Sequence, residues 1–302
     1  MMSHLQASKL FSIQGCVAVV TGAGSGLGRT MALSLDANGA SKVFIIGRRE
    51  DKLQETASLA INKTIITIKG DVSSKESLQA AYDSIASQTD HVDLLIANSG
   101  VMGPSARPPA AKPDGSKPSL AEVRDQLWSV PMEDFSKVFD INVTGSYYTV
   151  LAFLPLLEAT NKRRPAPEKD KLSPPTAQVV ITTSIAGFIR QVPFSFAYSL
   201  SKSATNHLVK MLSTTLSSYD IRVNGIAPGL YHSEMSADAF KVGDRGISDG
   251  SFPRERIPLT RGGSEEDIAG LILWLASASG GYINGSIIVT DGGRTAVHPA
   301  SY

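Results

Sequence analysis

A tyrosine and a lysine, Tyr198 and Lys202, stand four residues apart in the segment FAYSLSK, which otherwise has the composition of a helix. Four residues is about one helical turn, so both side chains leave the same face and can meet over one ligand. A tyrosine can donate or accept a proton, and a nearby lysine ammonium favours the phenolate and lowers a pKa that is usually about 10. The pair therefore predicts acid–base catalysis, unless the helix only presents a tyrosine and a lysine to solvent.

A glycine-rich turn, TGAGSGLG (21–28), follows the first apolar run of the chain and opens a helical segment. Such a turn lets the backbone approach a pyrophosphate and directs amide N–H groups and the positive end of the helix at it. Leu27 stands where a G-x-G-x-x-G motif has its third glycine, so the pattern is T-G-x-x-x-G-x-G. The alternative is a glycine-rich helix start that binds nothing. The residues expected to bind a dinucleotide are Gly22, Ser25, Gly26, Leu27 and Gly28.

Both motifs need a framework, and short apolar runs that alternate with helical segments provide one. The runs are rich in valine and isoleucine and barely alternate with polar residues, which is typical of strands covered on both faces. Strand and helix in alternation predict an α/β fold with a doubly wound parallel sheet of about seven strands and helices on both faces. The expected strands are 16–22, 42–47, 64–70, 92–100, 177–184, 221–229 and 286–293, and the expected helices are 26–39, 74–88, 131–158, 197–217 and 264–278.

Length and composition suit one large α/β domain or two smaller ones, and we predict a single domain over 1–302. Two segments rich in proline, lysine and glycine, 103–118 and 161–175, are predicted surface insertions. A third irregular segment, 231–262, lies between the last two expected strands, and its apolar residues could cover a ligand. It is a candidate substrate lid, with Met235, Phe240 and Phe252 as its apolar side chains.

Several classes of function are disfavoured by the same sequence. The formal net charge is +1, so nucleic acid and anionic membrane surfaces are not expected partners. The first residues lack the order of a signal peptide, and no stretch reaches the roughly 18 apolar residues of a membrane span. We therefore expect a soluble cytoplasmic protein. The single cysteine, Cys16, excludes an internal disulfide and a cysteine zinc cage, and no metal site is predicted.

A serine hydrolase is the other enzyme class to weigh. The sequence contains no G-x-S-x-G motif, and its five histidines show no triad context. His207 follows Tyr198 by nine residues on the same expected helix and so faces nearly the opposite side. His232 falls in the candidate lid, where an exposed loop histidine is the simpler interpretation. Hydrolysis is therefore the less favoured chemistry.

The order of the motifs resembles the short-chain dehydrogenase/reductase family, which has a Rossmann-like fold, from about residue 12 to 293 outside the two insertions. The resemblance implies a catalytic set of asparagine, serine, tyrosine and lysine. It assigns proton transfer to the tyrosine, a hydrogen bond to the nicotinamide ribose to the lysine, and a water and proton path to the asparagine. The serine would hold the substrate oxygen and stabilise its developing charge. The matching residues are Asn142 in NVTG, Ser184 in TTSIAG, Tyr198 and Lys202.

The same resemblance implies further cofactor contacts. Asp71 in GDV matches the aspartate that contacts adenine, and Asn98 in ANSG matches the family's N-A-G element. Gly229 and Ser233 match the P-G-x-x-x-T element near the nicotinamide, with serine in place of threonine.

The cofactor preference follows from IIGRRE, the end of the second expected strand. Gly47 stands where relatives that prefer NAD have an aspartate, and Arg48 and Arg49 follow it. An arginine presents a planar fork that suits a 2′-phosphate. NADP(H) is therefore predicted over NAD(H), although an arginine pair at the surface with Glu50 beside it is the alternative.

The predicted function is an NADP(H)-dependent oxidoreductase that transfers hydride between the nicotinamide and a ketone or secondary alcohol of a small organic substrate. The alternative is a catalytically silent protein that senses NADP(H) on the same fold. The resemblance also implies a homo-oligomer, a dimer or tetramer, formed through the helices at 131–158 and 197–217. The identity of the substrate and the direction of the reaction do not follow from the sequence.

Overall fold

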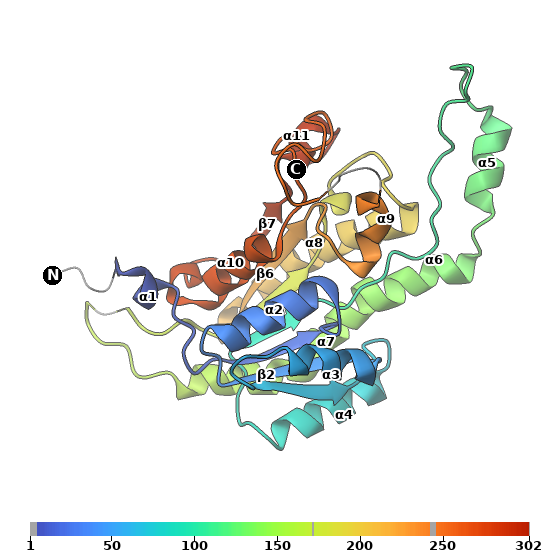
Figure 1. The fold of residues 1–302 in the computed structure, drawn as a ribbon. Coiled ribbons are helices and arrows are strands. Elements are labelled where there is room, and N and C mark those ends of the chain that lie inside the picture. The colour runs from blue at the N-terminus through green and yellow to red at the C-terminus, as the bar shows by residue number, and fades with distance from the viewer. Residues whose placement is uncertain (1–4, 171, 242–245, 302) are drawn as a thin grey trace.

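The computed structural model describes residues 5–170, 172–241 and 246–301. Its core is a seven-stranded parallel sheet, which confirms the predicted α/β fold and all seven expected strands (Figure 1). β2 has the bounds of its apolar run, and each of the other strands is shorter than its run at both ends, where the flanking residues belong to turns and loops. They are β1 (Val17–Thr21), β2 (Lys42–Gly47), β3 (Ile65–Lys69), β4 (Leu94–Ala97), β5 (Gln178–Thr182), β6 (Arg222–Pro228) and β7 (Ile287–Thr290).

The strand order is β3-β2-β1-β4-β5-β6-β7, so β1 lies between β2 and β4. Val20 pairs with Ile45 on one side and with Ile96 on the other. The chain turns outward in opposite directions from β1 and β4, which makes this pair the switch point of the sheet. Ligands bind doubly wound sheets beyond the carboxyl ends of the strands at such a point.

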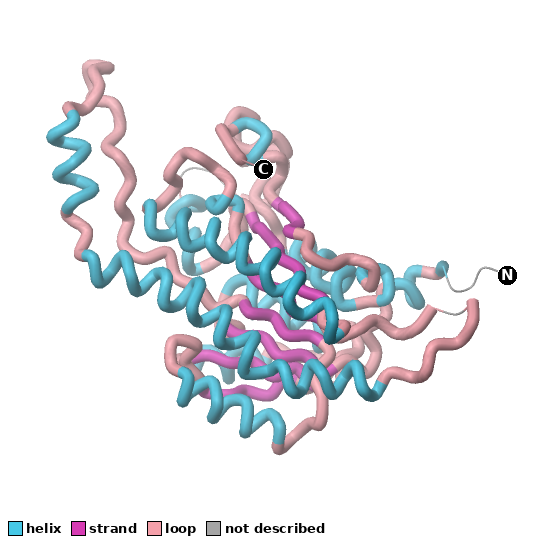
Figure 2. Tube along the Cα trace, turned by 180° about the vertical axis from the view of Figure 1, so that it is seen from behind, coloured by secondary structure: helices cyan, strands magenta, loops and turns pink. Residues whose placement is uncertain are grey.

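Helices cover both faces of the sheet, as Figure 2 shows from behind. Alternate strand residues face opposite sides, so Val19 and Phe44 join one buried cluster and Val20 and Ile45 the other. The first cluster packs under α4 (Lys75–Ala86), α7 (Gly145–Arg163) and α8 (Phe196–Leu216). The second packs under α2 (Gly26–Ala37), α3 (Glu50–Ser58) and α10 (Glu265–Ala276).

The helix expected over 131–158 is interrupted. It consists of α6 (Met132–Phe139), a π-helical turn η2 (Asp140–Thr144) and α7, which continues through Pro155 to Arg163. The wide turn between α6 and α7 has no signal in the apolar pattern, because one extra residue in a turn barely changes the spacing of apolar side chains.

A helix that the sequence analysis did not predict, α5 (Leu120–Trp128), follows the first insertion. Ser119 and Glu122 form a capping box at its start, but none of its residues is buried. Figure 1 shows α5 projecting from the body of the protein. Its apolar Leu120 and Trp128 are exposed, so no inward stripe marks it in the sequence.

The proline-rich segments differ in detail from the expectation. The first three residues of 161–175 belong to α7, and its described remainder contains no helix or strand. The segment 103–118 is a loop that touches the core through a bridge between Ala106 and Ser195. The segment 231–262 contains a 3-10 turn, η5 (Glu234–Ser236), and a short helix, α9 (Ala237–Phe240); residues 242–245 lie outside the described part. Short helices at the ends of the described chain are α1 (Ala7–Leu10) and α11 (Arg294–Val297).

Within the described ranges, no helix is both long and apolar enough to cross a membrane. The same residues contain no cluster of three histidine, cysteine, aspartate or glutamate side chains that could hold a metal ion.

Candidate active site

A cavity of about 420 Å³ opens at the carboxyl ends of the strands, at the switch point between β1 and β4. It extends from the glycine-rich turn to the start of α8, and most of the residues predicted from the sequence line it. Only Gly28 and Asn142 of that set do not line the cavity. The predicted residues in the lining are Gly22, Ser25, Gly26, Leu27, Arg48, Arg49, Asp71, Asn98, Ser184, Tyr198, Lys202, Gly229 and Ser233.

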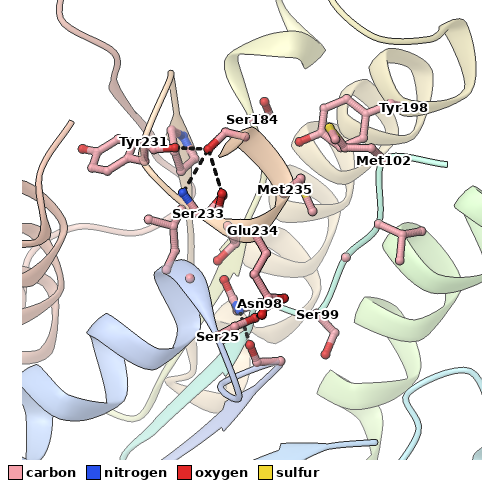
Figure 3. Close-up of a pocket in the computed structure, with 18 of the residues that line it drawn as sticks. Ser25, Asn98, Ser99, Met102, Ser184, Tyr198, Tyr231, Ser233, Glu234 and Met235 are labelled. Carbon is pink, nitrogen blue, oxygen red and sulfur yellow. Dashed lines mark hydrogen bonds between the residues drawn. The ribbon is translucent and has the colours of Figure 1, made fainter. Parts of the chain in front are cut away.

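Tyr198 and Ser184 meet at the inner end of this cavity. Tyr198 lies in the first turn of α8, where its backbone N–H donates to the Oγ of Ser195, the residue that caps the helix. The Ser184 side chain lies close enough to the Tyr198 hydroxyl to lower the pKa of the tyrosine. Ser184 Oγ in turn accepts from the backbone N–H of Ala186 at 3.1 Å. Both side chains line the cavity, where Figure 3 shows Ser184 and Tyr198.

Lys202 lies one turn further along α8 and is only 4% exposed. Its Nζ donates to the carbonyl oxygen of Thr182 at 2.8 Å and lies 5.9 Å from the centre of the Tyr198 ring. Burial lowers the pKa of Lys202 to about 8 because an ammonium loses its water shell. The predicted helical neighbours are therefore both buried, and the interpretation of a surface pair is wrong.

The sequence predicts that Lys202 lowers the pKa of Tyr198, but the structure gives the opposite direction. Burial instead raises the pKa of Tyr198, and the Ser184 side chain offsets this only in part. Sequence spacing shows that two groups share a helix face, whereas desolvation depends on everything packed around them.

Asn142 is 1% exposed and lies in the π-helical turn η2. Its Oδ1 accepts from the N–H of Val101 at 2.8 Å, and its Nδ2 donates to the carbonyl of Val101 and to Ser201 Oγ, each at 2.9 Å. Ser201 Oγ donates to the carbonyl of Tyr198. Asn142 therefore joins the loop after β4 to the start of α8. Single π-turns inside helices often occur at functional sites, because they redirect one side chain.

The glycine-rich turn is held very close to β4. Asn98 Nδ2 donates to the carbonyl of Thr21 at 3.0 Å. A Cβ at Gly28 would lie 2.4 Å from the same Nδ2, so only glycine fits there. Gly22 and Gly26 adopt positive φ angles of 69° and 55°, which glycine adopts without strain. The turn thus leaves an open backbone surface at the start of α2, which fits the pyrophosphate of a dinucleotide.

Asp71 and Arg48 lie together at the outer end of the cavity. Burial raises the pKa of Asp71, but hydrogen bonds from Ser73 and the nearby Arg48 outweigh this effect and leave the pKa lowered. The Arg48 side chain forms no hydrogen bond or ion pair with any residue in the described part of the chain. It is a free cation in the position from which the sequence predicts contact with a 2′-phosphate.

Arg49 is placed differently from its prediction. Its guanidinium donates to Glu234 Oε2 at 2.9 Å and to Ser25 Oγ at 3.2 Å, and Ser25 Oγ donates to the same carboxylate oxygen at 3.1 Å. Glu234 belongs to η5, about 200 residues later in the chain. Its carboxylate therefore ties the candidate lid to the glycine-rich turn, with both side chains about half exposed. In Figure 3, Glu234 lies near Ser25 below the Ser184 end of the cavity.

The candidate lid also contributes apolar lining. Met235 lines the cavity, as does Met102 from the loop after β4 (Figure 3). Phe240 and Phe252 instead pack with Leu230 in a small cluster of their own. Of the three apolar side chains noted in the sequence, only Met235 can therefore contact a ligand in this arrangement.

The lining residues that sequence reasoning did not single out include Met102, Tyr231, Glu234 and Arg294. They lie in loops or in helical turns of three or four residues, which are too short for apolar period or motif spacing to carry information. The sole signal available for Arg294 was its position directly after the last expected strand, in TDGGR.

Known proteins of the same type share both sequence and fold with this chain. A family model described as short chain dehydrogenase matches residues 16–242. The short-chain dehydrogenase/reductase PhomF of Diaporthe leptostromiformis is 41% identical over 303 residues, covering 99% of this chain and 97% of that protein.

Two solved structures show the same similarity. A short-chain type dehydrogenase/reductase from Mycobacterium marinum has a TM-score of 0.76 at 27% identity, covering 95% of this chain and 98% of that one. The Pseudomonas aeruginosa RhlG/NADP active-site complex has a TM-score of 0.75 at 28% identity, covering 94% and 98%.

Proposed function

Because the chain belongs to the short-chain dehydrogenase family and is an oxidoreductase acting on CH–OH or C=O groups, we propose that it uses NADP(H) to interconvert a ketone and a secondary alcohol. One observation carries this proposal. A single cavity joins the glycine cradle for a dinucleotide to a buried serine, tyrosine and lysine. The bound nicotinamide would supply or accept a hydride, and the chain must then manage one proton and the charge on the substrate oxygen.

Each side chain has a role that follows from its surroundings. Tyr198 donates the proton in reduction, and its raised pKa keeps it protonated near neutral pH. Ser184 donates a hydrogen bond to the substrate oxygen and stabilises the charge that develops there. Lys202 holds the cofactor ribose. The positive end of α8, which begins next to Tyr198, favours the phenolate that remains after proton transfer.

Asn142 acts as a positioning residue, since its amide holds Val101 and Ser201. A Cβ placed on Gly100 would lie 3.2 Å from Asn142 Oδ1 and 3.6 Å from Lys202 Nζ. This proximity supports the relay from Asn142 to Lys202 that the family resemblance implies. The remaining contacts proposed for the cofactor are Asp71 with adenine, Asn98 behind the turn, and Gly229 and Ser233 near the nicotinamide.

The cofactor preference rests on Arg48, the free cation beside Asp71. We expect NADPH to bind more tightly than NADH, and Arg48→Ala to weaken NADPH binding roughly 10- to 100-fold, because it removes a charge-assisted contact to phosphate. Fluorescence titration of the purified protein with each cofactor at matched ionic strength measures this. NADH affinity should change less than threefold.

Lys69→Ala is the control, because Lys69 is exposed and pairs with Glu50 outside the cavity. Equal affinity for the two cofactors would refute the role of Arg48. Failure to bind either cofactor would refute the enzymatic proposal as a whole.

Glu234 gives a second prediction about the cofactor. Its carboxylate shares the end of the cavity with Arg48 and holds Arg49 and Ser25, and these hydrogen bonds lower its pKa. A 2′-phosphate would compete with this carboxylate for the same donors. Glu234→Gln should therefore tighten NADPH binding about threefold to tenfold, with little change for NADH.

The matched control for that measurement is Glu265→Gln, which removes a carboxylate on α10 outside the cavity. Weaker NADPH binding by Glu234→Gln would show instead that the Glu234–Arg49 pair closes the lid over bound cofactor.

A catalytically silent NADP(H)-sensing protein is the alternative function. The buried Ser184 and Tyr198, which both line the cavity, favour catalysis, because sensing alone does not need a proton donor in a substrate cavity. Reduction of any ketone by NADPH in the purified protein would exclude the silent alternative.

Three further features belong to the proposal. The whole chain forms one domain, with 231–262 as a substrate lid. The protein is cytoplasmic, and cell fractionation tests this location. It also forms a homo-oligomer through α6, α7 and α8. Sedimentation velocity tests this, and a monomer would refute it. Apolar side chains on the outer faces of α7 and α8 support the oligomer: Tyr147, Phe196, Leu200 and Met211 are exposed.

A further inference from the structure

The cavity contains an arginine to which neither the family motifs nor the proposed chemistry gives a role. Arg294 is the first residue of α11, after β7, and it lines the same cavity as Ser184 and Tyr198. Its side chain has no hydrogen-bond or ion-pair partner among residues 5–170, 172–241 and 246–301, and its Nε is buried without an acceptor. A partly buried guanidinium whose Nε has no acceptor is costly, so the position favours an anionic partner.

The carboxylate of Asp291 does not fill that need. Asp291 lies close enough to act on Arg294 electrostatically, but its oxygens accept from the backbone N–H groups of Gly293 at 2.8 Å and Thr295 at 2.7 Å. Burial is the main influence on Arg294 and lowers its pKa, and the neighbouring Arg256 acts in the same direction. The guanidinium remains charged near neutral pH because an arginine pKa is normally above 12.

Arg294 is held at the end of the cavity away from the glycine-rich turn. The turn before it packs on the lid, where a Cβ at Gly293 would meet Pro258 at 3.1 Å. The segment after it runs along the loop that follows Ser184. There the N–H of Arg190 donates to the carbonyl of Pro299, and Ile189 forms a bridge with Ala300. The arginine therefore stands between the lid and the Ser184 loop, where substrate and not adenosine would lie.

The other lining at this end is mainly apolar, and it includes Met102, Ile189, Phe194 and Met235. The remaining lining cations have other positions: Lys202 is bonded to Thr182 beside Tyr198, and Arg48 and Arg49 lie toward the adenosine end. An apolar chamber with one partly buried cation selects a ligand that combines an apolar body with one anionic group.

We propose that Arg294 is a specificity-determining residue that binds a carboxylate on an otherwise apolar ketone or alcohol substrate. This inference rests on the proposed function, because it assumes that the reacting oxygen lies at Ser184 and Tyr198. The carboxylate would accept two parallel hydrogen bonds from the guanidinium, which is the geometry that arginine favours.

Two pairs of probes that differ only in charge test the proposal: 3-acetylbenzoate with 3-acetylbenzamide, and 4-acetylbenzoate with 4-acetylbenzamide. Binding of each is measured by calorimetric titration with and without NADP⁺, and reduction by NADPH is measured separately as kcat/KM. The wild-type protein should favour at least one benzoate over its amide by about tenfold or more. Arg294→Gln should weaken that benzoate roughly 10- to 100-fold and leave the amide within about threefold.

Three controls separate recognition from folding. Arg294→Lys keeps the charge and should restore part of the preference for the acid. Arg256→Gln removes a neighbouring guanidinium that stacks over Phe252 and does not line the cavity, so the preference should persist. The melting temperature and NADPH affinity of Arg294→Gln should match those of the wild-type protein.

Equal binding of acid and amide in the wild-type protein, or a preference that survives Arg294→Gln, would overturn the inference even if the ketones are reduced. Failure of every probe to bind would overturn the inference as well. Failure of the proposed function looks different, since NADPH would then not bind and neither ketone would be reduced, whatever the charge of the probe.

Discussion

Replacement of Tyr198 by phenylalanine is expected to lower kcat by about 10²- to 10⁴-fold, which is the usual contribution of a positioned acid or base. The change removes only the hydroxyl group. The ring keeps its edge-on contact with Phe194, at 5.8 Å between ring centres, so the start of α8 should not move. NADPH affinity should therefore stay within about twofold of the wild-type value.

The measurement is the steady-state rate of NADPH oxidation with a reducible ketone, together with a cofactor titration of each variant. Tyr219→Phe is the matched control, because Tyr219 is 60% exposed and lies after the end of α8. A loss of NADPH binding as large as the loss of turnover would mean that Tyr198 has a structural role. Full activity in Tyr198→Phe would assign the proton to another group.

The second large effect concerns Lys202, for which activity and stability should change in opposite directions. Lys202→Met should abolish measurable turnover and weaken NADPH binding, since the ammonium that holds the ribose is lost. The same variant should be more stable than the wild-type protein without cofactor. Burial lowers the pKa of Lys202 from 10.5 to about 8, and that difference corresponds to about 3 kcal/mol of destabilisation.

The stability difference should depend on pH in a defined direction. Below pH 8 the lysine is charged in both the folded and the unfolded state, so the folded protein bears the whole cost. Between about pH 8 and 10.5 the unfolded chain still binds the proton and the folded protein does not, so wild-type stability rises relative to the variant. The lost hydrogen bond to Thr182 removes about 1 kcal/mol, which leaves a net gain of about 2 kcal/mol in the variant near pH 7.

Urea unfolding of both proteins from pH 7 to 10.5 measures this difference. Lys210→Met is the control on the same helix, because the Lys210 ammonium is exposed and should give a small change that does not follow this pH course. If Lys202→Met is the less stable protein at every pH, other groups in the apo-protein must compensate the buried charge.

The framework was predictable from the sequence because strands buried on both faces leave a strong signal. Runs such as KVFIIG and AQVVITTS admit few interpretations, and the glycines and asparagine at their ends mark the edge where ligands bind. The wide turn at Asn142 and the projecting helix α5 left no comparable signal. The former changes the apolar period too little, and the latter buries nothing.

Site residues divide in the same way. Tyr198 and Lys202 were found because one helix fixes their spacing, and the sheet then brings Ser184 to them. Glu234 and Arg294 were not predicted because their roles depend on contacts with segments far away in the chain. The pKa of Tyr198 was misjudged for a related reason, since sequence spacing gives neighbours but not the depth of burial.

The arrangement of the cavity has a consequence for how such enzymes diverge. Ser184, Tyr198 and Lys202 lie within one short stretch, so proton transfer can be inherited or exchanged as a block. The substrate end is assembled from Met102, Met235 and Arg294, which lie in segments between and after the strands that are widely separated in the chain. No exchange of a single gene segment can transplant that end. New substrate preferences in this lineage should therefore arise by scattered point substitutions in loops, while the reaction itself is retained.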